Sequence, residues 1–194
     1  MNVVGLLLAA GEGRRMGGPK ALLRDAQGVT FLDRTLRVLL DGGCASVTVV
    51  LGASSDEVRA VLGETVWAAD EAVSVVVADD WALGMGASLR TGLGALPRDA
   101  DGALVTLVDL PDVGDAVVRR VLGSGVLRSA LARASYDGRV GHPVLIGADH
   151  WAGVAATASG DRGARDYLAT HEVTLVECGD LASGRDVDSP ADLA

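Results

Sequence analysis

Short apolar runs alternate along the chain with segments in which apolar residues recur every three or four positions. The short runs have the length of buried β-strands, and the longer spacing is typical of amphipathic helices. This pattern predicts strands at 3–9, 46–52, 73–78 and 102–108 and helices at 31–40, 54–63, 87–96 and 115–123. Strands separated by helices need crossover connections, so we expect an α/β fold with a mostly parallel sheet.

The pattern changes after residue 123. Asp137-Gly138 lies between two strand-like runs within 131–147, and this dipeptide favours a type I′ hairpin turn. Further helices are expected at 148–157 and 162–169, with a last strand at 173–178. The prediction is therefore one Rossmann-like domain over residues 1–194, a three-layer sandwich with an antiparallel hairpin late in the chain.

Composition narrows the function classes. With 49% hydrophobic residues the chain can form a core, and its net charge of −9 disfavours nucleic-acid binding. Residues 3–9 lack the preceding positive charge of a signal peptide, and no run approaches the roughly 20 apolar residues of a membrane span. Cys44 and Cys178 lack metal-ligand spacing, so we expect a cytoplasmic protein with two buried thiols.

The most unusual stretch is LLLAAGEGRRMGGPKALL at 6–23, which contains Lys20, the only lysine of the chain. Its glycines allow close backbone approach, and free N–H groups attract anions. With Arg14, Arg15 and Arg24, Lys20 makes a cationic patch opposed by one acid, Glu12. In a strand–turn–helix arrangement this patch predicts a polyanionic ligand such as a triphosphate.

Two known phosphate loops fail to match this stretch. Gly11, Gly13 and Gly17 give G-x-G-x-x-x-G, which is one residue longer than the dinucleotide fingerprint. Pro19 separates Gly18 from the lysine, so the G-K-[ST] ending of a P-loop is absent. An ordinary strand-to-helix turn with surface arginines is the alternative.

Three acids are candidates for binding Mg²⁺. Asp109 follows an apolar strand and should face the same crevice as the glycine loop. Asp186 and Asp188 alternate on an extended segment and should point to one side. The alternatives are structural, with Asp109 capping the next helix and Asp188 beginning a turn at Ser189-Pro190. Asp79, on the loop after the third strand, could contact the ribose or base.

The string LAAGEGRRMGGPKALL resembles the signature L-A-A/G-G-x-x-x-R-M-G-x-x-K of the MobA-like nucleotidyltransferases. Five further segments resemble their molybdopterin cytidylyltransferase branch, namely GMGASLRTGL (84–93), VTLVDLPDV (105–113), GHPVLIG (141–147), GDRGAR (160–165) and DVDSPADL (186–193). Gly86 and Ala87 replace residues of a serine-rich segment, and Val140 stands where the family has arginine before Gly141. Arg139 is the expected substitute for that arginine.

The resemblance implies a fold like that of nucleotide-diphospho-sugar transferases and a cleft shared by nucleotide and acceptor. Arg15, Lys20 and Asp109 would be catalytic, and Asp109, Asp186 and Asp188 would hold Mg²⁺. The nucleotide would contact Leu8, Ala9, Ala10, Gly11, Gly13, Arg14, Met16, Gly17, Asp79, Gly84 and Ser88. The acceptor pocket would contain His142, Asp161 and Arg165.

The resemblance implies transfer of a nucleotidyl group from a nucleoside triphosphate to a phosphate-bearing acceptor, with release of pyrophosphate. LAAG rather than LAGG favours CTP, and the resemblance implies molybdopterin as the acceptor and a recipient molybdoenzyme as a partner. The alternatives are a GTP-using guanylyltransferase, an enzyme of the same fold acting on a phosphosugar or phospholactate, and a non-catalytic nucleotide-binding maturation factor. Retention of Arg15, Lys20 and Asp109 together argues against the last.

Overall fold

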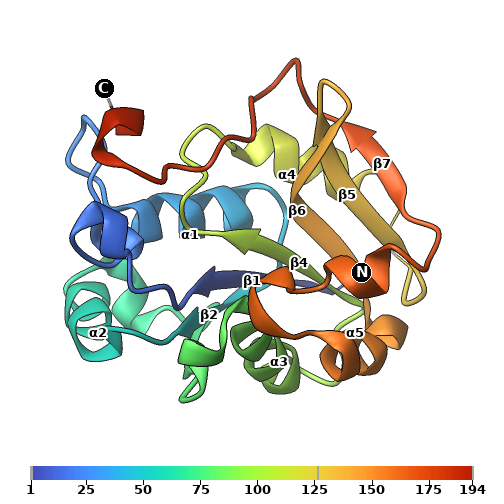
Figure 1. Ribbon diagram of the computed structural model, residues 1–194, viewed down its shortest axis with the longest axis horizontal. Coiled ribbons are helices and arrows are strands. Elements are labelled where there is room, and N and C mark those ends of the chain that lie inside the picture. Colours follow the sequence, from blue (N-terminus) through green and yellow to red (C-terminus); the bar gives the residue numbers. More distant parts are fainter. Residues whose placement is uncertain (1, 126, 194) are drawn as a thin grey trace.

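A seven-stranded sheet forms the centre of the molecule (Figure 1). The computed structural model describes residues 2–125 and 127–193. The strand order is β3-β2-β1-β4-β6-β5-β7. The strands are β1 (Val3–Ala9), β2 (Ser46–Leu51), β3 (Val73–Val77), β4 (Gly102–Leu107), β5 (Leu131–Tyr136), β6 (Arg139–Gly147) and β7 (Thr174–Glu177).

Strand directions match the expected mostly parallel sheet. β1 lies in parallel between β2 and β4, and β6 is the strand that runs antiparallel to its neighbours, β4 and β5. Asp137 and Gly138 both have positive φ, at 51° and 77°, as a type I′ turn between β5 and β6 requires. The predicted hairpin is therefore confirmed.

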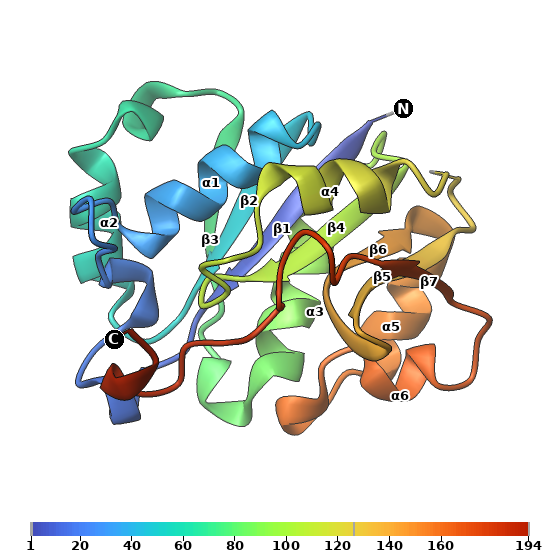
Figure 2. The same ribbon diagram turned by 90° about the horizontal axis from the view of Figure 1, so that it is seen from above.

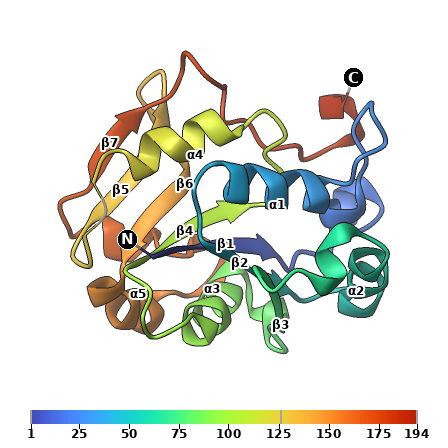
Figure 3. The same cartoon turned by 180° about the vertical axis from the view of Figure 1, so that it is seen from behind.

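Helices cover both faces of the sheet and complete the three layers. The helices are α1 (Phe31–Asp41), α2 (Ser55–Gly63), α3 (Met85–Ala95), α4 (Asp115–Leu122), α5 (Trp151–Thr157) and α6 (Arg165–Leu168). Figures 1 and 3 show α1 and α4 on one face, with α3 and α5 on the other. No helix among residues 2–125 and 127–193 has the length and hydropathy needed to cross a bilayer.

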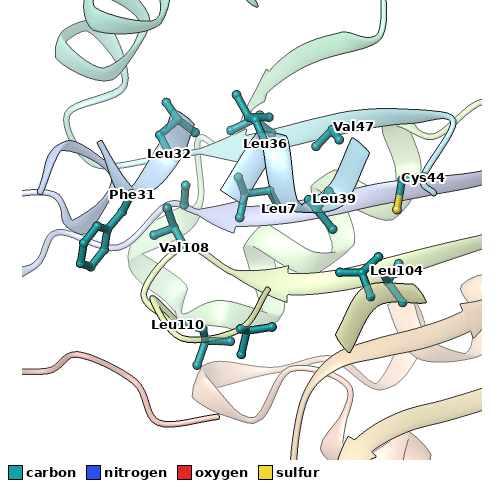
Figure 4. Close-up of a cluster of buried hydrophobic side chains, with 14 of the residues drawn as sticks. Leu7, Phe31, Leu32, Leu36, Leu39, Cys44, Val47, Leu104, Val108 and Leu110 are labelled. Atoms are coloured by element: carbon teal, nitrogen blue, oxygen red, sulfur yellow. The ribbon is translucent and has the colours of Figure 1, made fainter. Parts of the chain in front are cut away.

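The core is divided by the sheet into two apolar clusters. Leu7 of β1 packs with Leu36 and Leu39 of α1 on one side (Figure 4), whereas Leu6 faces Leu89 of α3 on the other. This alternation follows from the period of two along a strand. Helix α1 starts where the Thr30 hydroxyl accepts a hydrogen bond from the Asp33 N–H at 3.1 Å.

One local expectation is wrong. The glycine turn does not lead directly into a helix, because residues 10–30 form a long loop with 3-10 turns at Arg14–Met16 and Lys20–Leu22 before α1 begins. The long loop gives the glycine-rich stretch its own conformation, independent of a helix N-terminus.

Candidate active site

A cleft of about 520 Å³ opens at the carboxyl ends of β1 and β4. This is the position at which ligands bind in open parallel sheets. Most of the residues predicted for the site line it: Leu8, Ala9, Ala10, Gly11, Gly13, Arg14, Arg15, Met16, Lys20, Gly84, Ser88, Asp109, Asp161 and Asp188. Gly17, Asp79, Asp186, His142 and Arg165 lie outside the lining.

The glycine loop folds back on itself at one wall of the cleft. The Gly13 carbonyl accepts hydrogen bonds from the N–H groups of Met16 and Gly18, at 2.8 and 3.3 Å. Gly13 has a φ of 62°, and a Cβ there would lie 1.8 Å from the Gly18 carbonyl oxygen. Only glycine fits this position. Among the residues that the structure describes, the N–H groups of Gly11, Glu12 and Gly13 have no acceptor, so they are free to bind an anion.

Lys20 joins the loop to the acids of the site. Its ammonium donates to Asp109 Oδ2 and Asp188 Oδ1, each at 2.7 Å, and its side chain is only 18% exposed. Arg15, which is 75% exposed, lies 3.3 Å from the other oxygen of Asp188. Asp109 and Asp188 are 89 and 168 positions from Lys20 in the sequence, yet all three residues meet in one charge cluster.

The cluster alters the proton affinity of its members. Burial alone would lower the pKa of Lys20, but hydrogen bonds to Asp109 and Asp188 and their negative charges outweigh it and raise the pKa above its usual value. The hydrogen bond from Lys20, with the charges of Lys20 and Arg15, holds the pKa of Asp188 below its usual range. Lys20 is therefore a fixed positive charge at neutral pH.

The C-terminal segment brings the aspartate pair to the cleft. In Figure 2 it crosses the molecule and ends beside the loop that follows β1. The Val187 N–H donates to the Asp109 carbonyl at 2.9 Å, and the Val187 side chain is buried in the core. Asp186 and Asp188, on either side of Val187, each have a carboxylate oxygen within 4.8 Å of one from Asp109.

These three acids fit a divalent metal ion. Carboxylate oxygens are the hard ligands that Mg²⁺ and Mn²⁺ prefer. Asp109 Oδ1 is buried and has no hydrogen-bond partner among the described residues, so it retains an unused lone pair at this point. Asp109 does not cap a helix, since α4 begins after Gly114 without a side-chain cap. The donor set thus supports the predicted metal role, and the identity of the metal stays open.

The far wall of the cleft comes from two segments in close contact. A Cβ on Gly84 would lie 2.7 Å from Asp161 Oδ1, and one on Gly86 would lie 2.5 Å from the Ser159 nitrogen. These glycines let the start of α3 touch the 159–162 turn, which explains the missing serine at position 86. The contact directs Asp161 into the cleft beside the glycine loop, although the family resemblance assigns Asp161 to the acceptor pocket.

The predicted residues outside the lining have distinct surroundings. Asp79 is exposed, and its neighbour Asp80 pairs instead with Arg90 at 3.3 Å. His142 lies on β6 with its carbonyl accepting from the Tyr136 hydroxyl at 2.6 Å. Burial, assisted by the charge of Arg133, lowers the pKa of His142 to about 4, so its ring is neutral at pH 7. The roles of these residues remain predictions.

Sequence reasoning missed Trp81, which lines the cleft beside Ala10. A Cβ on Gly52 would lie 2.6 Å from the Trp81 Cβ and 2.7 Å from the Ala10 carbonyl oxygen. Gly52 therefore permits the indole to approach the start of the glycine loop. The available signal was a large aromatic residue directly after the acidic pair at 79–80, in a chain with only 3% aromatics.

One curated relative and two solved structures of a second protein are similar to this chain. Nicotine blue oxidoreductase of Paenarthrobacter nicotinovorans is 41% identical over 199 residues, covering 96% of this chain and 92% of that protein. Rv0371c of Mycobacterium tuberculosis H37Rv is 29% identical, with a TM-score of 0.79 over 99% of this chain and 95% of its own. A structure described as Rv0371C in complex with manganese is 28% identical, with a TM-score of 0.73 over 91% and 88% of the two chains.

The sequence pattern of a family described as the MobA-like NTP transferase domain matches residues 5–175. The matched range includes the glycine loop, Lys20, Asp109 and the far wall of the cleft. The extent of this match and the likeness of the 41% identical relative over almost the whole chain establish the family. The chain belongs to the MobA-like NTP transferase family.

Proposed function

We propose that this protein transfers a nucleotidyl group from CTP to a phosphate group of molybdopterin and releases pyrophosphate. The observation that carries the proposal is the Lys20 ammonium held between Asp109 and Asp188 at the open side of the glycine loop. A triphosphate needs concentrated positive charge and free N–H groups, and this wall of the cleft supplies both.

The residues of the chain act mainly by positioning and by neutralising charge. The N–H groups of Gly11 to Gly13 bind phosphate oxygens, while Lys20 and Arg15 balance the charge of the departing pyrophosphate. Mg²⁺ held by Asp109, Asp186 and Asp188 would supply further positive charge to the phosphates. An acceptor phosphate is already ionised at neutral pH, so no general base is required.

CTP is favoured because Ala10 stands where the GTP-using branch has glycine. Its side chain is buried against the cleft, and a methyl group crowds a purine more than a pyrimidine. We expect kcat/KM for CTP to exceed that for GTP by about tenfold or more, and Ala10→Gly to reduce this ratio. Steady-state pyrophosphate release with each nucleotide and purified molybdopterin measures it. Equal use of the two nucleotides would contradict the cytidylyltransferase assignment.

The same assay separates the alternative functions. Release that requires a phosphosugar or phospholactate in place of molybdopterin would indicate another acceptor. Tight nucleotide binding without release, for any acceptor supplied, would indicate a non-catalytic maturation factor. Either result would overturn the proposed reaction while leaving the nucleotide cleft in place.

A second candidate function comes from the 41% identical relative, which is named nicotine blue oxidoreductase. If the oxidoreductase reaction uses a nicotinamide dinucleotide, the free N–H groups of the glycine loop would bind its pyrophosphate as they would a triphosphate, although the loop lacks the dinucleotide fingerprint. Hydride transfer from the reduced nicotinamide to nicotine blue would then be the reaction. Loss of reduced-nicotinamide absorbance on mixing both substrates with the protein would support it, with Lys20→Met as the variant expected to weaken dinucleotide binding.

A further inference from the structure

A second group of cations lies beyond the cleft, where β5, β6 and α6 meet. Arg133 of β5 donates from Nη2 to the Gly141 carbonyl at 3.3 Å, which places its guanidinium beside His142. Arg165 begins α6, close enough for its charge to act on Arg133. Neither arginine has a carboxylate within 4.0 Å among the residues that the structure describes. Arg133 is half-buried and Arg165 is exposed, whereas the half-buried Lys20, Arg90 and Arg120 each pair with an aspartate.

Arg133 has unused hydrogen-bonding capacity. Its Nε is buried and has no partner in the described part of the chain. A buried donor without an acceptor costs free energy unless a ligand satisfies it. Burial, followed by the positive charge of Arg165, lowers the pKa of Arg133, because both disfavour its charged form.

The group adjoins the nucleotide cleft. Val144 of β6 pairs with Val105 of β4 on one side and with Arg133 on the other. Since neighbouring strands lie about 4.8 Å apart, Arg133 is roughly 10 Å across the sheet from β4, whose carboxyl end leads to Asp109. Asp161, four positions before Arg165, lines the cleft itself. A ligand bound at the two arginines could therefore reach a nucleotide in the cleft.

The family segment R-G-H-P-V-L calls for an arginine before Gly141, where this chain has Val140. The expected substitute, Arg139, is exposed in the hairpin next to Gly138, and it makes no ion pair among the described residues. Arg133 instead reaches the Gly141 carbonyl from the neighbouring strand. Arg133 thus brings a guanidinium from the neighbouring strand to the backbone of the segment that lacks the family arginine.

We propose that Arg133 and Arg165 form an oxyanion subsite that binds a phosphate group of the second substrate, with Arg133 in place of the arginine absent at position 140. The inference rests on the proposed function for the identity of the second substrate as a phosphate-bearing molecule. The neutral His142 ring beside Arg133 adds a hydrogen-bonding group without adding a charge. Guanidinium groups suit phosphate because they form paired charge-assisted hydrogen bonds.

The Arg133 Nε–H group itself reports on binding, because buried arginine Nε–H groups exchange slowly and give NMR signals. We would label arginine with ¹⁵N, assign the Arg133 signal from Arg133→Lys, and titrate the full chain with inorganic phosphate and, separately, with acetate. A saturable shift of this signal, tighter for phosphate than for acetate, is expected. Arg165→Met should weaken phosphate binding by about tenfold or more, whereas Arg139→Met should leave it unchanged.

Absence of a saturable shift in the unmodified chain would overturn the subsite, and so would equal or tighter binding of acetate or unchanged phosphate binding by Arg165→Met. Arg133→Lys is needed only to assign the NMR signal. The binding measurements use the unmodified chain, Arg165→Met and Arg139→Met. A parallel titration with Mg²⁺ and CTP separates the two proposals. If CTP binds but phosphate does not shift the Arg133 signal, the subsite is contradicted and the proposed function is not. If phosphate shifts the Arg133 signal but CTP does not bind, the proposed function is contradicted and the oxyanion site stands.

Discussion

Lys20 forms ion pairs with both Asp109 and Asp188 in the cleft. The sequence pointed to it as a lone lysine in a glycine loop, but its burial and its two carboxylate partners are apparent only in the structure. An exposed loop cation contributes little to stability, whereas a buried cation shared by two acids offsets the repulsion between them. Lys20 is therefore expected to matter for folding as well as for catalysis.

Lys20→Met keeps the length of the side chain and removes its charge. Turnover of CTP should fall by about a hundredfold or more, the scale of losing a preorganised charge donor. Tm should fall by roughly 2–6 °C, because Asp109 and Asp188 then repel each other without a shared cation. Arg24→Met is the control, since Arg24 donates to the Gly28 carbonyl outside the cleft. Turnover by Lys20→Met equal to that by Arg24→Met would contradict the role of Lys20.

At the scale of elements, the strands and the hairpin could be predicted because their signals are local. Alternating and continuous apolar runs identify β1 to β4, and Asp137-Gly138 identifies the turn between β5 and β6. The loop at 10–30 and the segment from 178 to 190 have no such period. Their paths depend on contacts between distant residues, so the meeting of Lys20 with Asp188 could be expected only from the strand-end rule and the family resemblance.

The C-terminal segment depends on Val187 as its apolar anchor. Val187→Ala removes two buried methyl-sized groups and should cost roughly 1–2 kcal/mol locally. Opening of the segment should then increase the hydrogen-exchange rate of the Val187 amide by about tenfold. We also expect a higher metal requirement for turnover, because Asp186 and Asp188 lose their fixed placement.

The matched control is Leu181→Ala, in which an exposed apolar residue earlier in the same segment is truncated. It should leave both the exchange rate and the metal requirement unchanged. If Val187→Ala behaves like this control, the segment is held by other contacts and its aspartates do not depend on the anchor.

At the scale of the whole molecule, stability should depend on pH through His142. The folded-state pKa of about 4 lies below the ordinary value of 6.5, so the unfolded chain binds more protons between these values. The contribution of His142 to the free energy of unfolding is fully present above about pH 6.5 and is lost as the pH falls towards 4. The loss is at most about 3 kcal/mol. Urea unfolding across this window should show a smaller loss for His142→Gln than for the unmodified chain.

Carboxylates also lose stabilising contacts in acid, so the difference between the two proteins is the quantity to compare. His171→Gln, which removes an exposed histidine, serves as the control and should retain the full pH dependence. An identical slope for His142→Gln and the unmodified chain would show that His142 titrates alike in the folded and unfolded states.

The fold and most of the cleft could be predicted because both follow from local patterns and from motifs at strand ends. The rest could not, for reasons seen at particular residues. Arg133 lies in the run LARASY, whose alternation indicates a strand. That pattern does not indicate which residues the Arg133 side chain contacts. Asp161 enters the cleft only because Gly84 permits close packing between α3 and the 159–162 turn. Such contacts are determined by three-dimensional packing between elements far apart in sequence.

Under the proposed function, Asp109 takes part in the chemistry of triphosphate cleavage. Asp109→Asn keeps the shape of the side chain and removes the negative charge that suits a hard divalent cation. Asp112→Asn is the matched control, because Asp112 is exposed and its carboxylate accepts hydrogen bonds from Ser183 outside the cleft.

The direct measurement is Mg²⁺-dependent pyrophosphate release from CTP in the presence of molybdopterin, with CTP binding and Tm followed on the same samples. For Asp109→Asn we predict release lower by about a hundredfold or more, with CTP still bound through the loop, Arg15 and Lys20. Asp112→Asn should release pyrophosphate normally. Near-normal release by Asp109→Asn would contradict the account, because Asp109 would then be a structural residue and the reacting phosphates would have to lie elsewhere.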